Sequence, residues 1–383
     1  MVGEIYLIKV LHLRDTNKVC GPGKTILETT ARIDTSRFNL SIGLFMDKQD
    51  QNNLYHKAAI DRNIDVIPIK TSNQFDPRII SQVISIVKSR GFDIIHSHEY
   101  KSDMVALIAG KYLKVPIITT AHGWITNSLK SKIYISVGKK ILPWFDYVIA
   151  VSPKIKEELQ RVGVKSSKIK LIYNAIVMED YIYDQIQNNY LIENYGIPEN
   201  AKIIGCVGRL SPEKGQLDLL YAANKVLQIN DQIYFVFVGD GPDRGRLENT
   251  ASQLGIADNI IFTGHLRDVR PVYRDINILA LTSYTEGFPN VVLEALCMNR
   301  PVLATNVGGT GDIIKNNKTG ILVEPGNIDQ IVAGLFTLLD NDVDSYRLVQ
   351  NGRQLVTEQY QFEARVEKVQ NLYEKIMNSN ANL

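Results

Sequence analysis

Short apolar runs alternate with helix-like stretches along most of this chain of 383 residues, and this alternation restricts the fold more than any other feature. Runs of strand length lie at residues 4–11, 40–45, 65–69, 93–96, 116–121 and 147–151. Stretches with the apolar spacing of helices lie between some of them, at residues 77–90 and 101–113. Strands that alternate with helices form parallel βαβ units, so the pattern predicts an α/β fold.

A polar stretch at residues 174–198, in which Asn, Gln, Asp and Tyr dominate, interrupts this alternation. The pattern restarts with apolar runs at residues 202–207, 233–238, 259–262, 276–281 and 302–305, and a charged helical stretch follows at 362–377. The length suits two domains of about 150–200 residues each. We therefore predict two doubly wound, Rossmann-like domains that face each other across a cleft, residues 1–180 and residues 181–361.

The composition argues against several classes of protein. The 43 basic and 41 acidic residues give a net charge of +2, so there is no global case for nucleic-acid binding. The three cysteines are far apart and lack C-x-x-C spacing, which argues against a disulfide framework or a zinc site and fits a reducing compartment. No run of about 18 apolar residues is present, so we predict no membrane span and a cytoplasmic protein.

The first motif is CGPGKT at residues 20–25, which follows the first predicted strand and its loop. Gly21 and Gly23 would let the backbone approach a ligand closely, beside a helix N-terminus that favours negative charge. The motif is not a nucleotide-triphosphate P-loop, because Lys18 occupies the position where that pattern needs a glycine. A structural turn and a ligand-facing loop both remain open interpretations.

Three histidines lie at the carboxyl ends of predicted strands, in HSHEY at residues 96–100 and TAHGW at residues 120–124. Ligands of doubly wound sheets bind at this end of the strands. His122 precedes a glycine in a loop, which favours a functional role. A metal site at His96 and His98 is disfavoured, because residues two apart on a strand point to opposite faces. We expect no metal ligands in this protein.

The motif GRLSPEKG at residues 208–215 follows the predicted strand at 202–207. Arg209 and Lys214 lie five residues apart across a turn that contains proline and begins a helix. Two cations beside a helix N-terminus can bind a diphosphate without a metal. The alternative is that both are solvated charges of a surface loop.

The strongest motif is TEGFPNVVLEA at residues 285–295. Pro289 suits the first turn of a helix, and Glu294 then lies about one turn inside it. Glu286 lies in the preceding loop. Both carboxylates can therefore face one ligand, with the N–H groups of residues 287–290 between them.

Taken in order, these motifs resemble the retaining glycosyltransferases of family 4, also called glycosyl transferases group 1, which have the two-domain GT-B fold. The resemblance also rests on AVSP at 150–153, VGDGP at 238–242, FTGH at 262–265, NRPVLAT at 299–305 and VGG at 307–309, and it covers nearly the whole chain. It implies an N-terminal acceptor-side domain and a C-terminal donor domain, with a helix at 362–383 that packs back on the first domain.

The resemblance also implies roles for individual residues. Arg209 and Lys214 would bind the donor diphosphate, Glu294 the ribose and Glu286 the transferred sugar. His122 would line the reacting centre, and Gly21 and Gly23 would bring N–H groups to a phosphate. The turn before the second glutamate would meet the sugar or the phosphate through Gly287, Phe288, Pro289, Asn290 and Val291.

The function implied is transfer of a hexosyl or N-acetylhexosaminyl group from a nucleotide-diphosphate sugar, with UDP favoured, to a glycan or lipid-linked acceptor. Retention of anomeric configuration, a part in cell-surface polysaccharide synthesis, and no cofactor or metal are implied as well. Three alternatives stay open: a nucleotide-sugar epimerase on the same fold, a non-catalytic sugar- or nucleotide-binding subunit, and a pyridoxal-phosphate-dependent phosphorylase.

One stretch raises the possibility of a membrane partner. Residues 104–145 contain six lysines and no Asp or Glu, with Trp144 and Phe145 at their end. A basic amphipathic surface with aromatic residues is suited to the anionic face of a membrane. A buried helix with solvated lysines is the equal alternative.

Overall fold

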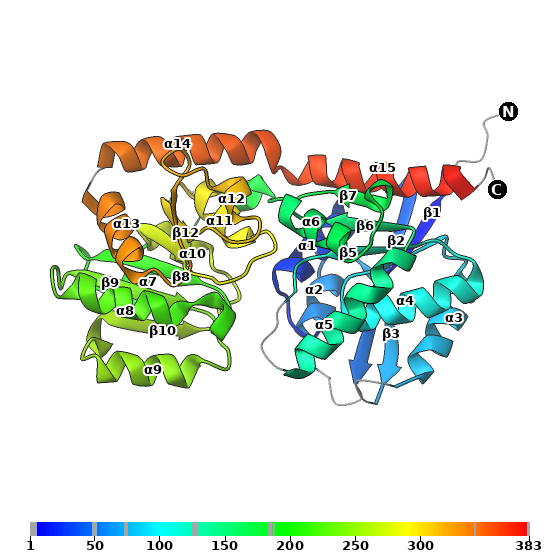
Figure 1. The fold of residues 1–383 in the computed structure, drawn as a ribbon, viewed down its shortest axis with the longest axis horizontal. Helices are drawn as coiled ribbons and strands as arrows, with labels where there is room; N and C mark the ends of the chain where they lie inside the picture. The colour runs from blue at the N-terminus through cyan, green and yellow to red at the C-terminus, as the bar shows by residue number, and fades with distance from the viewer. Residues whose placement is uncertain are drawn as a thin grey trace. The chain divides into compact units, whose positions relative to one another are not determined.

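A computed structural model describes residues 6–47, 52–72, 76–124, 129–182, 186, 188–340 and 342–380, although not the side chains at 129–133, 342–343 and 380 (Figure 1). The chain divides into two compact units. Unit 1 comprises Met1–Asn174 together with Phe362–Leu383, and unit 2 comprises Ala175–Gln361. The chain therefore crosses from the first unit to the second and returns with its last helix.

Unit 1 contains a parallel sheet of seven strands in the order β3-β2-β1-β4-β5-β6-β7. The strand order reverses between β1 and β4, which pair directly with each other. Crevices for ligands form at such a reversal, beyond the carboxyl ends of the two strands. The strands are β1 Ile8–Arg14, β2 Phe38–Asp47, β3 Asp65–Thr71, β4 Ile94–Ser97, β5 Ile117–Ala121, β6 Tyr147–Ala150 and β7 Ile169–Leu171.

The helices of unit 1 connect these strands, and the last helix of the chain joins them. Helices α3, α4 and α5 pack side by side, whereas α15 packs beside α1. Val369, Leu372, Tyr373 and Ile376 of α15 share a core cluster with side chains of the central strands. The helices are α1 Gly21–Arg32, α2 Leu54–Ile60, α3 Arg78–Arg90, α4 Tyr100–Leu113, α5 Leu129–Ile141, η1 Leu142–Trp144, α6 Pro153–Arg161, η2 Ser166–Lys168 and α15 Phe362–Asn380.

Unit 2 repeats this plan with a parallel sheet of six strands in the order β10-β9-β8-β11-β12-β13. Here the order reverses between β8 and β11. The strands are β8 Lys202–Val207, β9 Ile233–Val238, β10 Ile260–Gly264, β11 Ile278–Leu281, β12 Val302–Thr305 and β13 Ile321–Val323. The helices are η3 Met178–Tyr181, α7 Tyr190–Tyr195, η5 Pro212–Lys214, α8 Gln216–Leu227, α9 Arg244–Gln253, η6 Ala257–Asn259, α10 Arg270–Asp275, α11 Asn290–Cys297, α12 Thr310–Ile313, α13 Ile328–Asp340 and α14 Asp342–Gln359.

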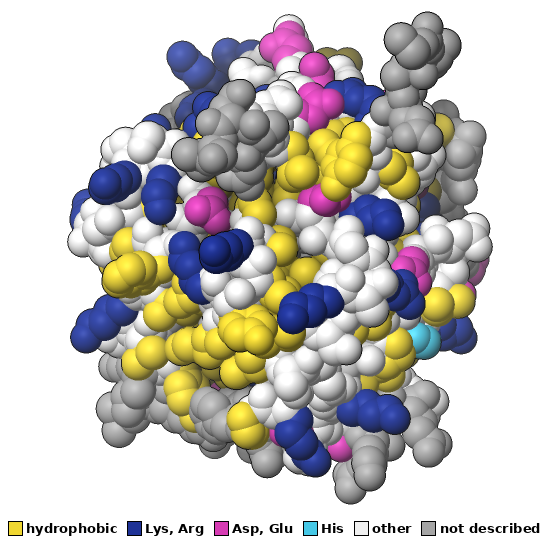
Figure 2. Space-filling view, turned by 90° about the vertical axis from the view of Figure 1, so that its right-hand side faces the viewer, with side chains coloured by type: hydrophobic (Ala, Val, Ile, Leu, Met, Phe, Trp, Pro, Cys, Tyr) yellow, Lys and Arg dark blue, Asp and Glu magenta, His cyan; other side chains and the backbone are white. Residues whose placement is uncertain are grey.

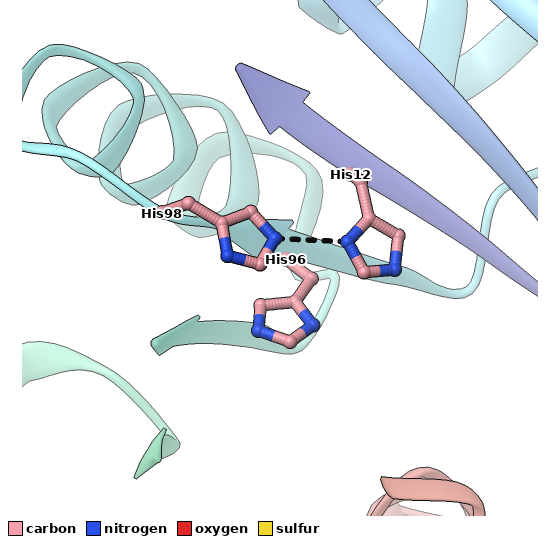
Figure 3. Close-up of side chains that lie close together, drawn as sticks. All are labelled: His12, His96 and His98. Carbon is pink, nitrogen blue, oxygen red and sulfur yellow. Dashed lines mark hydrogen bonds between the residues drawn. The ribbon is translucent and has the colours of Figure 1, made fainter. Parts of the chain in front are cut away.

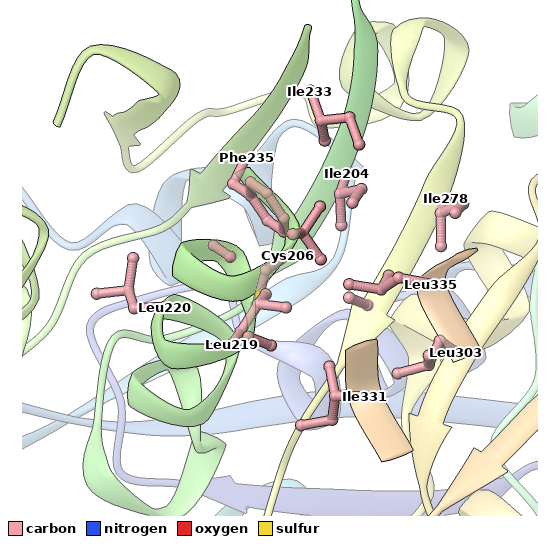
Figure 4. Close-up of a cluster of buried hydrophobic side chains, with 14 of the residues drawn as sticks. Ile204, Cys206, Leu219, Leu220, Ile233, Phe235, Ile278, Leu303, Ile331 and Leu335 are labelled. Carbon is pink, nitrogen blue, oxygen red and sulfur yellow. The ribbon is translucent and has the colours of Figure 1, made fainter. Parts of the chain in front are cut away.

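The core of unit 2 lies between its sheet and helices α8 and α13 (Figure 4). Ile204 and Phe235 extend from central strands toward Leu219 of α8 and Leu335 of α13, and all four side chains are buried. Strands covered on both faces need apolar side chains on both faces, which explains the continuous apolar runs of the sequence. This packing fixes the strand ends, and with them the loops that carry the polar motifs.

The predicted α/β class with two doubly wound sheets is confirmed. The strands β7 and β13, which lie at sheet edges, were not predicted. Each has three residues, too few to give a periodic signal. Among the residues described, no helix has the length and apolar character needed to cross a membrane.

Candidate functional site

The polar motifs of unit 2 gather at the carboxyl end of its sheet, where the strand order reverses. Arg209 and Lys214 follow β8, and Glu286 follows β11, which is the neighbour of β8 in the sheet. Lys214 and Glu286, 72 positions apart in the chain, are thus brought to one edge because their strands pair. The sheet topology places the predicted cations and the predicted carboxylate at the same switch point.

Lys214 and Glu286 form an ion pair across this switch point. Lys214 Nζ lies 2.6 Å from Glu286 Oε1, and Ser283 Oγ donates to the same oxygen at 2.6 Å. The Glu286 side chain is 9% exposed and that of Lys214 is 23% exposed. The buried carboxylate is therefore held by two donors, and a ligand phosphate would compete with it for the ammonium.

Arg209 differs from Lys214 in its surroundings. Its side chain is exposed and has no ion-pair partner within the part of the chain that the structure describes. Its backbone is fixed, because Gln216 Nε2 donates to the Arg209 carbonyl oxygen at 2.8 Å. Arg209 thus presents an uncompensated positive charge from an anchored loop, which is what binding of a diphosphate requires.

Glycines allow the loops at this edge to pack against one another. Gly308, from the VGG motif, has φ of +56°, and a Cβ there would lie 1.7 Å from the carbonyl oxygen of Glu286. Gly215, with φ of +62°, approaches the carbonyl oxygen of Thr282 in the same way, at 2.1 Å. No other residue fits such a left-handed position at this distance. The glycines of the motifs therefore fix the loop that holds Glu286.

Glu294 lies in α11 but is buried, with 7% of the residue exposed. Tyr273 Oη of α10 donates to Glu294 Oε2 at 2.9 Å, and Tyr181 of η3 also hydrogen-bonds this carboxylate. Burial beside this carboxylate raises the pKa of both phenols well above 10. The tyrosines therefore remain neutral donors and fix the orientation of Glu294.

Helix α11 begins directly after the loop that carries Glu286. Pro289 is its N-cap residue rather than its first helical residue, and Asn290 and Val291 form the first turn. Phe288 is buried, and its ring lies 5.2 Å from that of Tyr360. Gly287 accepts a hydrogen bond from Gly309 N at 2.9 Å. The turn is thus fixed on both sides, with the N-terminus of α11 available for an anion.

Unit 1 has a second polar edge, beyond β1 and β4. Arg14, at the end of β1, is 1% exposed and forms an ion pair with Glu99, which follows β4. Burial raises the pKa of Glu99 to about 7 despite the nearby guanidinium. Gly21 and Gly23 lie in the first turn of α1, and a Cβ at Gly23 would lie 3.0 Å from the Tyr55 ring. Gly23 therefore lies in a turn that packs closely against the Tyr55 ring.

His96 and His98 lie on the same side of the sheet, so the prediction that their rings point apart is wrong. The ring centroids are 4.4 Å apart and the planes differ by 25°. Strand β4 ends at Ser97, so the alternation of side chains no longer holds at His98. His12, opposite His96 in the β1–β4 pairing, completes the group, and its Nδ1 lies 2.9 Å from His98 Nε2 (Figure 3).

The three imidazoles have the spacing of a metal site but already form a hydrogen-bond network. Their ligand atoms lie within 4.8 Å of one another. Five of the six ring nitrogens have partners: His12 and His98 bond each other, Tyr373 Oη bonds His12 and His96 at 3.2 and 2.8 Å, and Thr120 Oγ1 bonds His96 at 2.8 Å. Burial lowers the pKa of His12 to about 3 and that of His96 well below 6.5, so both rings are neutral.

His122 lies in the loop after β5, beside this network. Its ring is 5.8 Å from that of His98, with 28° between the planes. Both of its nitrogens are buried, and neither has a hydrogen-bond partner among the residues described, which stop at 124 and resume at 129. Burial lowers the pKa of His122 well below 6.5. The structure thus places His122, a predicted site residue, beside His98, which was not predicted to contact a ligand.

The sequence analysis did not identify the residues that hold the site side chains in position, because these residues do not stand out as motifs. Ser283, Tyr273 and Tyr181 hold the two glutamates, and Tyr373 holds two histidines. The nearness of Ser283 to Glu286 was the one available signal, since three residues separate them within one loop. The tyrosines lie in elements that are distant in the chain. A single aromatic residue there would be predicted to belong to the hydrophobic core.

Two protein-family models match the chain. The model described as Glycosyltransferase Family 4 matches residues 44–180, and the model described as Glycosyl transferases group 1 matches residues 188–355. The first match lies within unit 1 and the beginning of unit 2, and the second lies within unit 2.

Characterised relatives match over most of their length. The chain is 24% identical over 386 residues to the Escherichia coli UDP-Gal:alpha-D-GlcNAc-diphosphoundecaprenol alpha-1,3-galactosyltransferase, covering 96% of each chain. It is 25% identical over 337 residues to the Staphylococcus aureus capsular polysaccharide biosynthesis glycosyltransferase CapM, covering 85% of this chain and 86% of CapM.

The fold matches a solved structure over nearly the whole chain. Anabaena HepE in complex with UDP-glucose superimposes with a TM-score of 0.84 at 20% identity, covering 96% of this chain and 100% of HepE. The two parallel sheets thus have the GT-B fold. Together with the two matching models, the site motifs and the fold establish that the chain belongs to the family 4 glycosyltransferases, the glycosyl transferases group 1.

Proposed function

We propose that this glycosyltransferase transfers a hexosyl or N-acetylhexosaminyl group from a UDP-sugar to a glycan or lipid-linked acceptor in cell-surface polysaccharide synthesis, with retention of configuration. The observation that carries the proposal is the group at the unit 2 switch point: exposed Arg209, and Lys214 paired with Glu286. The names of the relatives support the choice of substrates, since one transfers galactose from UDP-Gal to a lipid diphosphate-linked sugar and another belongs to capsule synthesis.

The diphosphate would bind between the two cations and the N-terminus of α11. Negative charge grows on the leaving diphosphate as the anomeric C–O bond breaks, so donors fixed where the charge develops lower the barrier. Arg209 supplies a free positive charge, and Lys214 can turn from Glu286 toward the phosphate. Because these groups can neutralise the charge, we propose that the transfer needs no metal and no cofactor.

The two glutamates would then bind the rest of the donor. Glu286, fixed by Ser283, would accept hydrogen bonds from hydroxyls of the transferred sugar. Glu294, fixed by Tyr273, would hold the ribose hydroxyls. Since this arrangement uses Glu286 for sugar binding, we favour front-face attack, in which the leaving phosphate takes the acceptor proton, over a covalent glycosyl-enzyme.

Unit 1 is proposed to bind the acceptor, with His122 at the reacting centre and Gly21 and Gly23 near a phosphate. This assignment takes unit 1 as the acceptor-side domain and unit 2 as the donor domain. The unpartnered nitrogens of buried His122 support it, because neutral imidazoles pair well with sugar hydroxyls.

A lipid-linked acceptor would make contact with an anionic membrane useful, from the cytoplasmic side. Unit 1 exposes Tyr112 by 67% and Trp144 by 65%. One face of unit 1 shows hydrophobic side chains set among many Lys and Arg side chains (Figure 2). Lys139 contributes less than its charge implies, since it pairs with Glu158 at 3.3 Å and lies 4.1 Å from the Trp124 ring centroid.

The donor is tested by thermal-shift measurements with UDP-, GDP- and ADP-sugars, because a ligand that binds only the native state raises the melting temperature. We expect UDP-sugars to raise it for the wild type and not for a Lys214→Met, Arg209→Met double variant. Arg246→Met, in an exposed part of α9, is the matched control. Stabilisation by GDP- or ADP-sugars alone would overturn the choice of UDP.

The reaction is tested by incubating enzyme and the stabilising donor with and without acceptor glycans. Slow hydrolysis at most, without acceptor, is expected of a transferase, whereas a stereoisomer of the donor would identify an epimerase. Donor binding without any turnover would identify a non-catalytic subunit. A yellow chromophore in the purified protein would point to pyridoxal phosphate and a phosphorylase.

A further inference from the structure

Three buried imidazole nitrogens at the carboxyl edge of the unit 1 sheet have no hydrogen-bond partner among the residues described. They are Nδ1 of His98 and both ring nitrogens of His122. Polar atoms in protein interiors are nearly always paired, because a group that leaves water without a new partner raises the free energy. His98 and His122, whose rings stack on each other, therefore carry unsatisfied nitrogens that a polar ligand group would pair.

The ligand that fits these nitrogens is a neutral hydroxyl group. Burial is the first cause that lowers the pKa of both rings well below 6.5, and nearby guanidinium charges add to it. A neutral imidazole has one donor and one acceptor nitrogen, and a hydroxyl can match either. A phosphate would instead prefer a cationic partner. Unlike Arg14 at the same edge, these two rings are thus suited to a sugar hydroxyl rather than to an anionic group.

The hydrogen bonds that join His98, His12 and Tyr373 determine whether the unpartnered His98 Nδ1 donates or accepts a hydrogen bond. In one arrangement Tyr373 donates to His96, so His12 donates to Tyr373 and accepts from His98 Nε2. His98 Nδ1 then carries no proton and accepts. In the other arrangement Tyr373 donates to His12, His12 donates to His98, and Nδ1 carries the proton. The single hydroxyl proton of Tyr373 decides between them, because that oxygen touches both His12 and His96.

We propose that His98 binds a sugar hydroxyl through Nδ1, and that Tyr373 of α15 is a positioning residue that sets, through His12, whether this nitrogen donates or accepts. The proposal rests on the proposed function for the presence of a sugar. It assigns the last helix of the chain a part in substrate recognition in unit 1, beyond packing of the core. The hydroxyl could belong to the acceptor or to the transferred sugar, and the kinetic test separates the two.

The test compares Tyr373→Phe and His98→Asn with Tyr147→Phe. Tyr147 packs against the same core cluster as Tyr373 but does not take part in the histidine network, so it controls for loss of a hydroxyl from this core. We expect Tyr373→Phe and His98→Asn to raise KM for one sugar substrate by about five- to tenfold, the effect of one neutral hydrogen bond. A rise for the acceptor identifies acceptor binding, and a rise for the UDP-sugar identifies the transferred sugar; either supports the proposal.

The second measurement needs no substrate. The ¹⁵N shifts of the imidazoles in histidine-labelled protein report the tautomer of each ring. We expect Tyr373→Phe to change the His98 shifts, and Tyr147→Phe to leave them as in the wild type. A purely structural role for Tyr373 would lower stability without altering the tautomer of a ring it does not touch.

The outcomes are separable from those of the proposed function. If the wild type transfers no sugar from any UDP-sugar, the proposed function fails, and the ring shifts still test the network. Unchanged His98 shifts together with unchanged KM for both substrates in Tyr373→Phe would overturn the proposal. Stoichiometric Zn²⁺ binding that His98→Asn abolishes would also overturn it, by making the three imidazoles a metal site.

Discussion

Lys214 Nζ lies 2.6 Å from Glu286 Oε1, although 72 residues separate the two in the chain. Each comes from the loop beyond one of the two strands that flank the reversal of strand order in unit 2. Glu286 compensates the charge of Lys214, whereas Arg209 is exposed and has no such partner among the described residues. In the proposed donor site, the diphosphate would replace Glu286 as the partner of Lys214.

Arg209→Ala and Lys214→Ala should each lower turnover by at least about a hundredfold, the scale of losing one placed donor. Lys214→Ala also leaves the Glu286 carboxylate without its ammonium, so Glu286→Gln in the same chain should restore part of the lost stability. Steady-state kinetics and urea unfolding measure the two effects. Activity that EDTA abolishes and Mn²⁺ restores would contradict the metal-free assignment.

Gly308→Ala should disrupt the Glu286 loop. An added Cβ would lie 1.7 Å from the Glu286 carbonyl oxygen, on a backbone with φ of +56°. Gly255→Ala is the matched control, because its φ is +71° but no atom lies within 4 Å of the added Cβ. We expect Gly308→Ala to lower the free energy of unfolding by about 1–3 kcal/mol more than the control, and to weaken UDP-sugar binding. Equal effects of both variants would show that the loop can move aside.

The fold was predictable from the sequence because each central strand is a short apolar run, as at 202–207 and 233–238, and both of these runs end before a glycine. The residue types at the unit 2 edge were predictable for the same reason, since they follow those strands directly. The sequence did not show which side chains of different helices and strands would form hydrogen bonds with one another. His12 and His98 bond each other over 86 positions, and only the β1–β4 register brings them together.

Glu294 was predicted as a site residue, but its hydrogen-bond partners could not be predicted from the sequence. Its place in a helix after the strand was expected, but its burial against Tyr273 was not. Tyr273 lies 21 residues earlier, in an amphipathic stretch where a tyrosine reads as part of the core. The carboxylate is therefore both a predicted ribose contact and a hydrogen-bond acceptor inside unit 2.

Glu294→Ala should consequently lose most of the UDP-sugar affinity and also destabilise unit 2, by about 1–3 kcal/mol, because two tyrosine hydroxyls lose their acceptor. Glu294→Gln keeps an acceptor oxygen and should preserve stability while still weakening donor binding. Calorimetric titration and urea unfolding separate the two losses. Wild-type turnover in Glu294→Ala would refute the assignment to the donor site.

Binding to anionic membranes should depend on the lysines of the 104–145 segment. We expect sedimentation with anionic liposomes at low salt, little with neutral ones, and loss of the difference as salt screens the charges. Replacing Lys130, Lys132, Lys139 and Lys140 by Gln should abolish it and leave UDP-sugar binding intact. Replacing Lys139 alone should have a small effect, because Glu158 already compensates its charge. Equal sedimentation with both liposomes at low salt would remove the membrane contact.

Unit 1 should lose stability on mild acidification because it buries four neutral histidines, His12, His96, His98 and His122. Their pKa values in the folded state lie below the ordinary value of 6.5, chiefly through burial. The unfolded chain therefore binds more protons, so the stabilisation is present above pH 6.5 and is lost as the pH falls below it. Between pH 7.5 and 5.5 each histidine should contribute a loss on the order of 1 kcal/mol. Buried Glu99 and Asp103, with pKa values raised to about 7 and about 6, offset part of this loss. His98→Asn should reduce this pH dependence, whereas His265→Asn, at an exposed position of unit 2, should not. An equal pH dependence of urea unfolding in the wild type and His98→Asn would mean that the buried His98 ring titrates as it does in water.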